Sequence, residues 1–442
     1  MRLIDSVATT RAMAEIFSDE SLLRAMLDFE TALAQAEAQV GVIPQSAADA
    51  IRNAASVEAF DVVKLAQASL RAGTLSIPLV KALTARVQEV DKESARFVHW
   101  GATSQDVADT AIVLLLRRAS AILAADHARL ETALLRLSNQ HAGTVMLGRT
   151  LLQPAPPITF GLKVAGWFGA LRRGWTRLES AFQDVTIVEF GGASGTLAAL
   201  GEQGLAVSSA LAHGLNLRDP EAPWHAHRDR VAAVICACGI YTGSLAKMAH
   251  DIALLMQAEV REVAEPATEG RGGSSTMPHK RNPTGCSLAL AAAHRVPGMV
   301  ANFLFGMTQE HERGAGGWQA EWTTIARVME DTALALASMA EVAEGLTVDA
   351  ARMRANIDAT RGVIFAERAM ILLGATLGRD GAHKLLDQAT SRTLESGRSL
   401  ADVLADFPEA ARVLSKEQIE NLNVPEAYLG SAEAFRRQLL AP

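Results

Sequence analysis

Cysteine and aromatic residues are scarce in this sequence of 442 residues. The three cysteines, at positions 236, 238 and 286, are odd in number and too few for a disulfide framework, and they favour a reducing compartment. Aromatic residues make up 5% of the chain whereas alanine and leucine are frequent, so we expect helices rather than sheets. The N-terminus lacks the basic start and apolar run of a signal peptide, and no run reaches about 18 apolar residues. These absences predict a cytoplasmic protein with no membrane contact.

Basic charge is not in excess either. Lysine and arginine total 42 against 49 aspartate and glutamate, which gives a net charge of −7. Because nucleic-acid binding needs a basic surface, we expect no nucleic-acid partner. The chain also lacks paired metal-ligand motifs, a GxxxxGK[ST] phosphate loop and a Rossmann fingerprint after a strand. We therefore expect no metal and no nucleotide cofactor.

Helical periodicity dominates what is present, and the prolines fall mostly between the periodic windows. Shorter helical segments flank a central block, and the best strand signal is VTIVEF at residues 185–190. The pattern predicts an all-α fold of three domains, 1–110, 111–355 and 356–442, with a long helical bundle in the central one. Five windows predict the long helices: 102–142, 158–185, 228–263, 283–308 and 323–346.

The segment GRGGSSTMPHKRNP, residues 270–283, carries the densest chemistry. Glycines and hydroxyls precede a cluster of positive charge that includes Lys280. Asn282 and Pro283 predict a helix that starts with Asn282 as the N-cap and Pro283 at the first helical position. Because a helix N-terminus favours anions, we expect an anion-binding loop with Ser274 as a nucleophile or proton donor.

Two further segments place polar groups where a carboxylate could bind. VHWGATSQD, residues 98–106, precedes the first long helix and offers His99 and the hydroxyls of Thr103 and Ser104. GRTLLQPAPPITFG, residues 148–161, offers Arg149, Thr150 and Gln153.

These three segments resemble the signature regions of the fumarase/aspartase superfamily. GGSSTMPHKRNP matches the G-S-S-x-M-P-x-K-x-N-P pattern, and the similarity continues in MLDFETALAQAEA, EFGGASGTLAALG, PWHAHRDR and QEHERGAGGWQAEW. The resemblance implies that Ser274 transfers a proton on the carbon next to a substrate carboxylate, and that Lys280 is catalytic and, with Asn282, holds that carboxylate. It also implies that Ser275 binds substrate. It further implies a homotetramer in which the regions around Thr103, Thr150 and Ser274 meet from three subunits.

The resemblance implies further substrate contacts at His99, Thr103, Ser104, Arg149, Thr150 and Gln153. Leu151, however, stands where the family pattern has a histidine that protonates an expelled nitrogen. Because leucine cannot transfer a proton, the leaving group should need none, as for a carboxylate. In reverse, a substrate carboxylate adds to a double bond and closes a lactone.

This chemistry favours the branch that lactonises 3-carboxy-cis,cis-muconate to 4-carboxymuconolactone in protocatechuate breakdown. Leu151 and Pro154 replace a tryptophan and a histidine of that branch. Turnover of 3-sulfomuconate is therefore an alternative, as are an adenylosuccinate-type lyase and a catalytically inactive helical structural protein.

A tricarboxylate substrate also needs cations from elsewhere in a chain of net charge −7. Arg228 in PWHAHRDR and Arg313 in the polar break at 309–313 are candidates. Each is as readily a salt-bridged structural residue.

Overall fold

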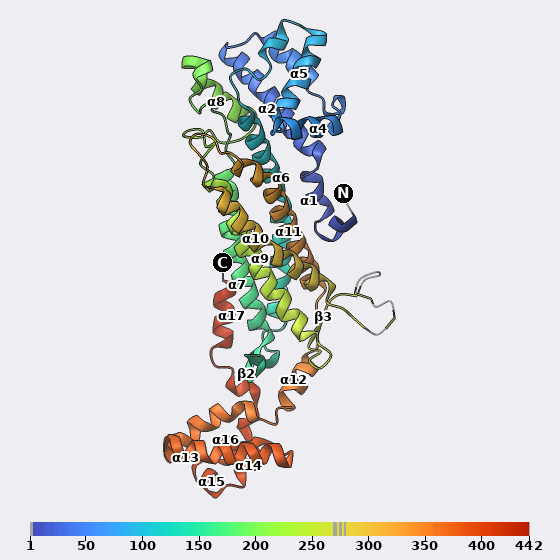
Figure 1. Cartoon of the computed structure of the whole chain (residues 1–442). Helices are drawn as coiled ribbons and strands as arrows, with labels where there is room; N and C mark the ends of the chain where they lie inside the picture. Colours follow the sequence, from blue (N-terminus) through green and yellow to red (C-terminus); the bar gives the residue numbers. More distant parts are fainter. Residues whose placement is uncertain (1–2, 268–271, 274–275, 278–279, 442) are drawn as a thin grey trace. The chain divides into compact units, whose positions relative to one another are not determined.

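The computed structural model describes residues 3–267, 272–273, 276–277 and 280–441, and in these residues helices dominate (Figure 1). The all-α prediction is confirmed. The chain divides into two compact units. Unit 1 comprises residues 1–127, 173–246 and 288–337, and unit 2 comprises 128–172, 247–287 and 338–442. The three domains predicted from sequence have other boundaries, and that division stays a prediction.

Five long helices form where the periodic windows predicted them, and each begins in one unit and ends in the other. Their ends agree with the expected windows mostly to within a few residues, because glycine and proline bound most of these windows. One proline, Pro297, lies inside a helix. The five are α6 (Ser104–Gln140), α7 (Phe160–Val185), α9 (Asp229–Leu255), α10 (Thr284–Gly306) and α11 (Gly317–Gly345).

Unit 1 adds α2, which has 22 residues, and a set of shorter helices to its parts of the five long ones. Its helix α2 starts after the side-chain cap of Ser18 and ends at Gly41, whose φ of 87° only glycine adopts readily. Phe29 and Leu33 of α2 are fully buried in the core of this unit. The short elements are η1 (Leu3–Val7), α1 (Arg11–Ile16), α2 (Asp19–Val40), α3 (Gln45–Ala54), η2 (Val57–Ala59), α4 (Val62–Ala72), α5 (Ser76–Val90), η3 (Ser94–Phe97), η4 (Ala198–Gln203) and α8 (Gly204–Gly214).

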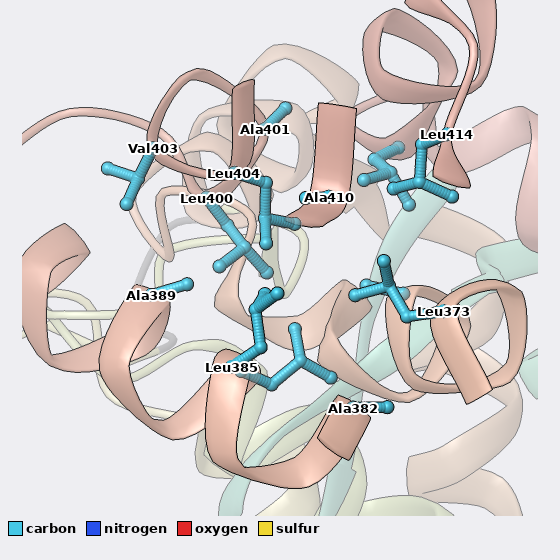
Figure 2. Packing of buried hydrophobic residues seen from close by; sticks show 13 residues of the cluster. Leu373, Ala382, Leu385, Ala389, Leu400, Ala401, Val403, Leu404, Ala410 and Leu414 are labelled. Carbon is cyan, nitrogen blue, oxygen red and sulfur yellow. The ribbon is translucent and has the colours of Figure 1, made fainter. Parts of the chain in front are cut away.

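Unit 2 contains two small antiparallel pairs of strands and the C-terminal helices. Figure 2 shows the core of these helices, where Leu373, Leu385, Leu400 and Leu404 point toward one another. Gly378 has non-helical angles and breaks α13 in two. The elements are β1 (Val145–Thr150), β2 (Gln153–Thr159), β3 (Val263–Ala264), β4 (Thr347–Val348), α12 (Ala350–Asp358), η5 (Val363–Phe365), α13 (Ala366–Ser396), α14 (Leu400–Ala405), α15 (Pro408–Val413), α16 (Lys416–Leu422), η6 (Pro425–Tyr428) and α17 (Ala432–Leu440).

The strand prediction at residues 185–190 is wrong. Helix α7 continues to Val185, and in the described chain this segment contributes a single isolated bridge, Ile187 to Arg218. The hairpin β1–β2 was missed because three prolines, at 154, 156 and 157, conceal β2. A strand tolerates proline where it pairs on one side only, and β2 pairs with β1 alone among the described strands.

Candidate active site

The start of α6 is anchored by a carboxylate in its first turn. The side chain of Asp106 is fully buried and accepts hydrogen bonds from the backbone N–H of Thr103 (2.8 Å), Gly191 (3.1 Å) and Gly192 (3.0 Å). A carboxylate at this position also interacts favourably with the helix dipole. Asp106 therefore fixes the loop at 191–192 against the segment that holds Thr103.

Two predicted substrate contacts meet at this loop. Gly192 has φ +68°, and a Cβ atom there would lie 2.7 Å from the carbonyl oxygen of Gly101, so glycine permits the close approach. Arg313 then reaches both segments: its Nη1 donates to Thr103 Oγ1 (2.9 Å) and its Nη2 donates to the Gly192 carbonyl (3.3 Å). Arg313 is half-buried, and Ser104 follows Thr103 at the same helix start.

His99 lies four residues before Thr103 and pairs with a buried acid. Its Nδ1 is 2.7 Å from Oε1 of Glu30 on α2, and the side chains are 16% and 0% exposed. Burial alone would lower the pKa of His99, but the carboxylates of Glu30 and Asp106 raise it above its usual value. His99 also adopts a left-handed backbone conformation, with φ 60°.

Arg228, by contrast, is taken up by two buried carboxylates. Its guanidinium donates to both oxygens of Asp109 (2.7 and 3.1 Å) and to both oxygens of Glu321 (3.1 Å to Oε1 and 2.7 Å to Oε2), and it is 2% exposed. Burial lowers the pKa of Arg228, but the two carboxylates outweigh it and raise the pKa. The indole Nε1 of Trp318 donates to Asp109 as well (2.9 Å). This geometry favours the structural alternative for Arg228 over contact with a substrate.

A second buried network surrounds Asp106. Nε2 of His225 lies 2.6 Å from Asp106 Oδ1 and 3.2 Å from Glu189 Oε1, while Glu189 Oε2 accepts from the N–H of Trp224 (2.8 Å). Burial, together with the negative charge of Asp106, raises the pKa of Glu189 well above its usual value. One histidine and two carboxylates are residue types that hold metals. Here the contacts of His225 with both carboxylates, and the hydrogen bonds of the carboxylates with backbone amides, account for the arrangement.

The hairpin β1–β2 of unit 2 carries three predicted residues. Arg149 donates to both oxygens of the buried Glu262 (3.0 and 2.6 Å), and Asn356 donates to the same carboxylate (2.7 Å). Arg149 keeps 26% of its side chain exposed. Thr150 and Gln153, both exposed, form the last pair before the turn.

The turn itself consists of Leu151 and Leu152. Both have positive φ, 50° and 64°, and their exposed fractions are 97% and 76%. A two-residue turn of this kind normally takes asparagine and glycine, because other residues are strained at positive φ. Two exposed leucines in a strained turn indicate a surface selected for something other than the stability of the hairpin.

The segment that precedes α10, residues 270–283, belongs to unit 2. Ser274 and Ser275 lie outside the described residues. Lys280 is exposed, and the half-buried Asn282 donates its N–H to the carbonyl of Gly272 (3.0 Å).

The expected helix start, with Asn282 as the N-cap and Pro283 at the first helical position, is wrong by one residue. Helix α10 starts at Thr284, and its first-turn amides at Gly285 and Cys286 donate to the buried carboxylate of Glu265 (2.9 and 2.8 Å). These two amides are therefore not available to a substrate anion. The sequence did not indicate this, because Glu265 lies about 20 residues away and nothing local ties it to the helix.

The structure thus groups the predicted residues by unit. Unit 1 gathers Thr103, Ser104 and Arg313 at the start of α6 with His99 nearby in sequence, and unit 2 places Arg149, Thr150 and Gln153 on one hairpin. Three buried carboxylates that support these residues, Glu30, Asp106 and Glu262, were not predicted from the sequence. Glu30 carried a signal: it and Glu37 interrupt the apolar face of MLDFETALAQAEA seven residues apart.

The chain is similar to known proteins in sequence and in structure. Residues 6–298 match the profile described as Lyase, and residues 362–439 match that of the adenylosuccinate lyase C-terminus. The chain is 48% identical to 3-carboxy-cis,cis-muconate cycloisomerase of Bradyrhizobium diazoefficiens, over 99% of this chain and 97% of that protein. It is 46% identical to the cycloisomerase of the same name from Pseudomonas aeruginosa, over 100% and 96%. The structure of 3-carboxy-cis,cis-muconate lactonizing enzyme from Pseudomonas putida superposes with a TM-score of 0.94, at 45% identity, over 100% and 98% of the chains.

Proposed function

We propose, from the premise that this chain belongs to the lyase family of the fumarase/aspartase superfamily, that it lactonises 3-carboxy-cis,cis-muconate to 4-carboxymuconolactone. The observation that carries the proposal is Leu151 at the tip of the β1–β2 hairpin, where the family pattern has a histidine. A reaction with a carboxylate as the entering or leaving group needs no acid at that position. Relatives that are 46–48% identical over nearly their whole length carry the same activity in their names.

The reaction needs two functions from the protein. The substrate's own carboxylate forms the new C–O bond, and the electron pair of the double bond moves onto a neighbouring carboxylate, which becomes an aci-carboxylate. Lys280 and Asn282 stabilise that charge as positioned donors. Ser274 then delivers a proton to the carbon, which completes the lactone without any cofactor.

In the proposed tetramer, residues of both units bind the substrate, and the two sets come from different subunits. Thr103, Ser104, His99 and Arg313 hold carboxylates at the start of α6, and Thr150 and Gln153 do so beside the hairpin turn. Arg149 contributes through the exposed part of its side chain, and Ser275, which follows Ser274 in the sequence, is a further substrate contact. The pathway is protocatechuate degradation in the cytoplasm, with no nucleic-acid partner.

The direct test is a spectroscopic assay of the purified protein. We expect loss of 3-carboxy-cis,cis-muconate and formation of the lactone, with side-by-side rates for 3-sulfomuconate and adenylosuccinate. The C-terminal profile favours adenylosuccinate as the second candidate, and Leu151 opposes it. Release of AMP without lactone formation would replace the proposal by that alternative, whereas inertness toward all three would favour a structural protein.

The same proposal includes a homotetramer, which an apolar helix surface supports. Helices α9 and α10 are long and apolar enough to span a membrane by length and composition alone, and 56% and 28% of their most apolar windows are buried. On α10 the side chain of Phe305 is 86% exposed and that of Leu304 is 44% exposed. Packing of α10 against other copies of the chain would cover this surface, as in a shared bundle.

Mixed assemblies test whether the sites are shared. We expect Ser274→Ala and Thr150→Val to be nearly inactive as pure tetramers, because each lacks one part of every site. Dissociated and reassembled together, they should regain activity, since about a quarter of the sites in random mixtures combine both intact residues. The measurements are the lactonisation rate and the mass of the assembly. Verified mixed tetramers that stay inactive would contradict sites shared between subunits.

A further inference from the structure

Helix α2 carries two buried carboxyl groups that the reaction as described does not use. Glu30 and Glu37 are seven residues apart, so they lie on the same face of α2, and they are 1% and 0% exposed. One oxygen of Glu30, Oε1, contacts Nδ1 of His99 at 2.7 Å. Among the described residues, Glu30 Oε2 and both oxygens of Glu37 have no hydrogen-bond partner. Burial of a carboxyl group costs free energy unless the group has a partner. The contact with His99 is therefore the interaction that accounts for a buried carboxyl group at Glu30.

The contact between Glu30 and His99 determines which nitrogen of the imidazole ring is turned toward Glu30. When Nδ1–H donates to Glu30, the other ring nitrogen, Nε2, carries a proton as well only if the ring is protonated and therefore cationic. The backbone of His99 is held at φ 60°, an arrangement that costs free energy for a residue other than glycine and is typical of functional segments. His99 belongs to the segment that continues into Thr103, where Arg313 is bound.

We propose that Glu30 is a positioning residue, which orients the imidazole of His99 through Nδ1 so that Nε2–H donates to a carboxylate of the bound substrate. The inference rests on the proposed function, because it takes His99 as a substrate contact. Glu30 itself does not touch the substrate; it acts through the ring, as a carboxylate does behind a histidine in other sites.

The charges around the ring support a cationic His99. Burial would lower its pKa, but Glu30 from α2 and Asp106 from α6 outweigh burial and raise it. Glu37 faces Glu30 from the same helix. Burial, with the charge of Glu30, raises the pKa of Glu37 to about 9, so Glu37 is largely protonated at neutral pH and adds little negative charge. The pair Glu30–His99 therefore presents a positive donor to an anion.

The test compares Glu30→Gln with wild-type enzyme and with two controls. Glutamine keeps the size of the side chain but removes the negative charge, so we expect KM to rise about tenfold with kcat changed less than about threefold. The alkaline limb of kcat/KM should move to lower pH, because His99 loses the charge that raises its pKa. The readouts are KM and kcat measured separately and the pH profile.

Glu37→Gln is the matched control, since it makes the same change on the same buried helix face at a group that is already neutral. It should leave KM and the pH profile as in wild type. His99→Gln provides the second arm, because it removes the ring without burying a new group. It should raise KM as Glu30→Gln does, and the double variant should be no worse than either single one.

The outcomes separate this inference from the proposed function. A wild-type protein without lactonising activity would overturn the proposed function before Glu30 is tested. An active wild type whose Glu30→Gln variant keeps the wild-type KM and pH profile would overturn the positioning role. Additive effects of Glu30→Gln and His99→Gln would also overturn it, since the two residues would then act independently.

Discussion

The start of α6 and the hairpin β1–β2 are both predicted to contact substrate, yet they differ in how the chain supports them. At the start of α6, Asp106 binds three backbone amides and Arg313 bridges Thr103 to the loop at 192. At the hairpin turn, Leu151 and Leu152 are strained and exposed. One region is organised by its own unit, and the other presents side chains that its unit does not cover.

The difference indicates two ways of building a site. Buried carboxylates fix the α6 segment in one arrangement before any ligand arrives, which reduces the cost of ordering it on binding. The hairpin keeps a strained and exposed turn, and we expect its residues to serve a contact outside the folded unit. In the proposed tetramer that contact is a neighbouring subunit with its substrate.

Removal of Asp106 should break the organised region and have the largest effect. Asp106→Ala deletes acceptors for three amides and leaves the buried His225 without its 2.6 Å carboxylate partner, so we expect a loss of about 3–5 kcal/mol in the free energy of unfolding. Denaturant titration measures it. Asp229→Ala is the matched control, since Asp229 is an exposed acid in the first turn of α9, and it should cost less than about 1 kcal/mol. Similar losses for both would contradict the anchoring role.

A change at the hairpin turn should separate stability from activity. Replacing Leu151 by Asn and Leu152 by Gly supplies the residues that the turn prefers, so the free energy of unfolding should stay equal or rise by about 1 kcal/mol. The rate of lactonisation should fall about tenfold or more, because the turn no longer offers its apolar surface. Thermal unfolding and kcat/KM are the measurements.

Leu70→Gln is the control, because Leu70 is an exposed leucine of α4, and this variant should keep full activity. A turn variant that is as active as the wild type would show that the two leucines serve no contact.

The pH dependence of stability concerns Glu37 on α2, in the same unit as the start of α6. Glu37 has a pKa of about 9 in the folded protein against an ordinary value of 4.5. Between these values the folded chain binds the proton and the unfolded chain releases it, so stability falls as pH rises. The slope for one proton is at most about 1.4 kcal/mol per pH unit. Unfolding at pH 5 to 9 should show a shallower slope in Glu37→Gln, and parallel curves would contradict a protonated Glu37.

Part of the site was predictable and part was not. Thr103 and Arg313, far apart in sequence, were both named and do meet. Arg228 was equally open as a substrate contact and as a salt-bridged residue, because an arginine looks the same in sequence whether its partner is a ligand or Asp109. The sequence at the start of α10 predicted an anion site, but in the structure the carboxylate of Glu265 accepts from two amides of its first turn.

The sequence by itself determined the five long helices and the identity of the chemical segments, because periodicity, proline spacing and short motifs are local properties of the chain. The tertiary structure alone decided which polar groups are free. The side-chain partners of Asp106, Arg228 and His99 lie 69 to 119 residues away. Such pairs form only when folding removes water and leaves each buried charge in need of a specific partner.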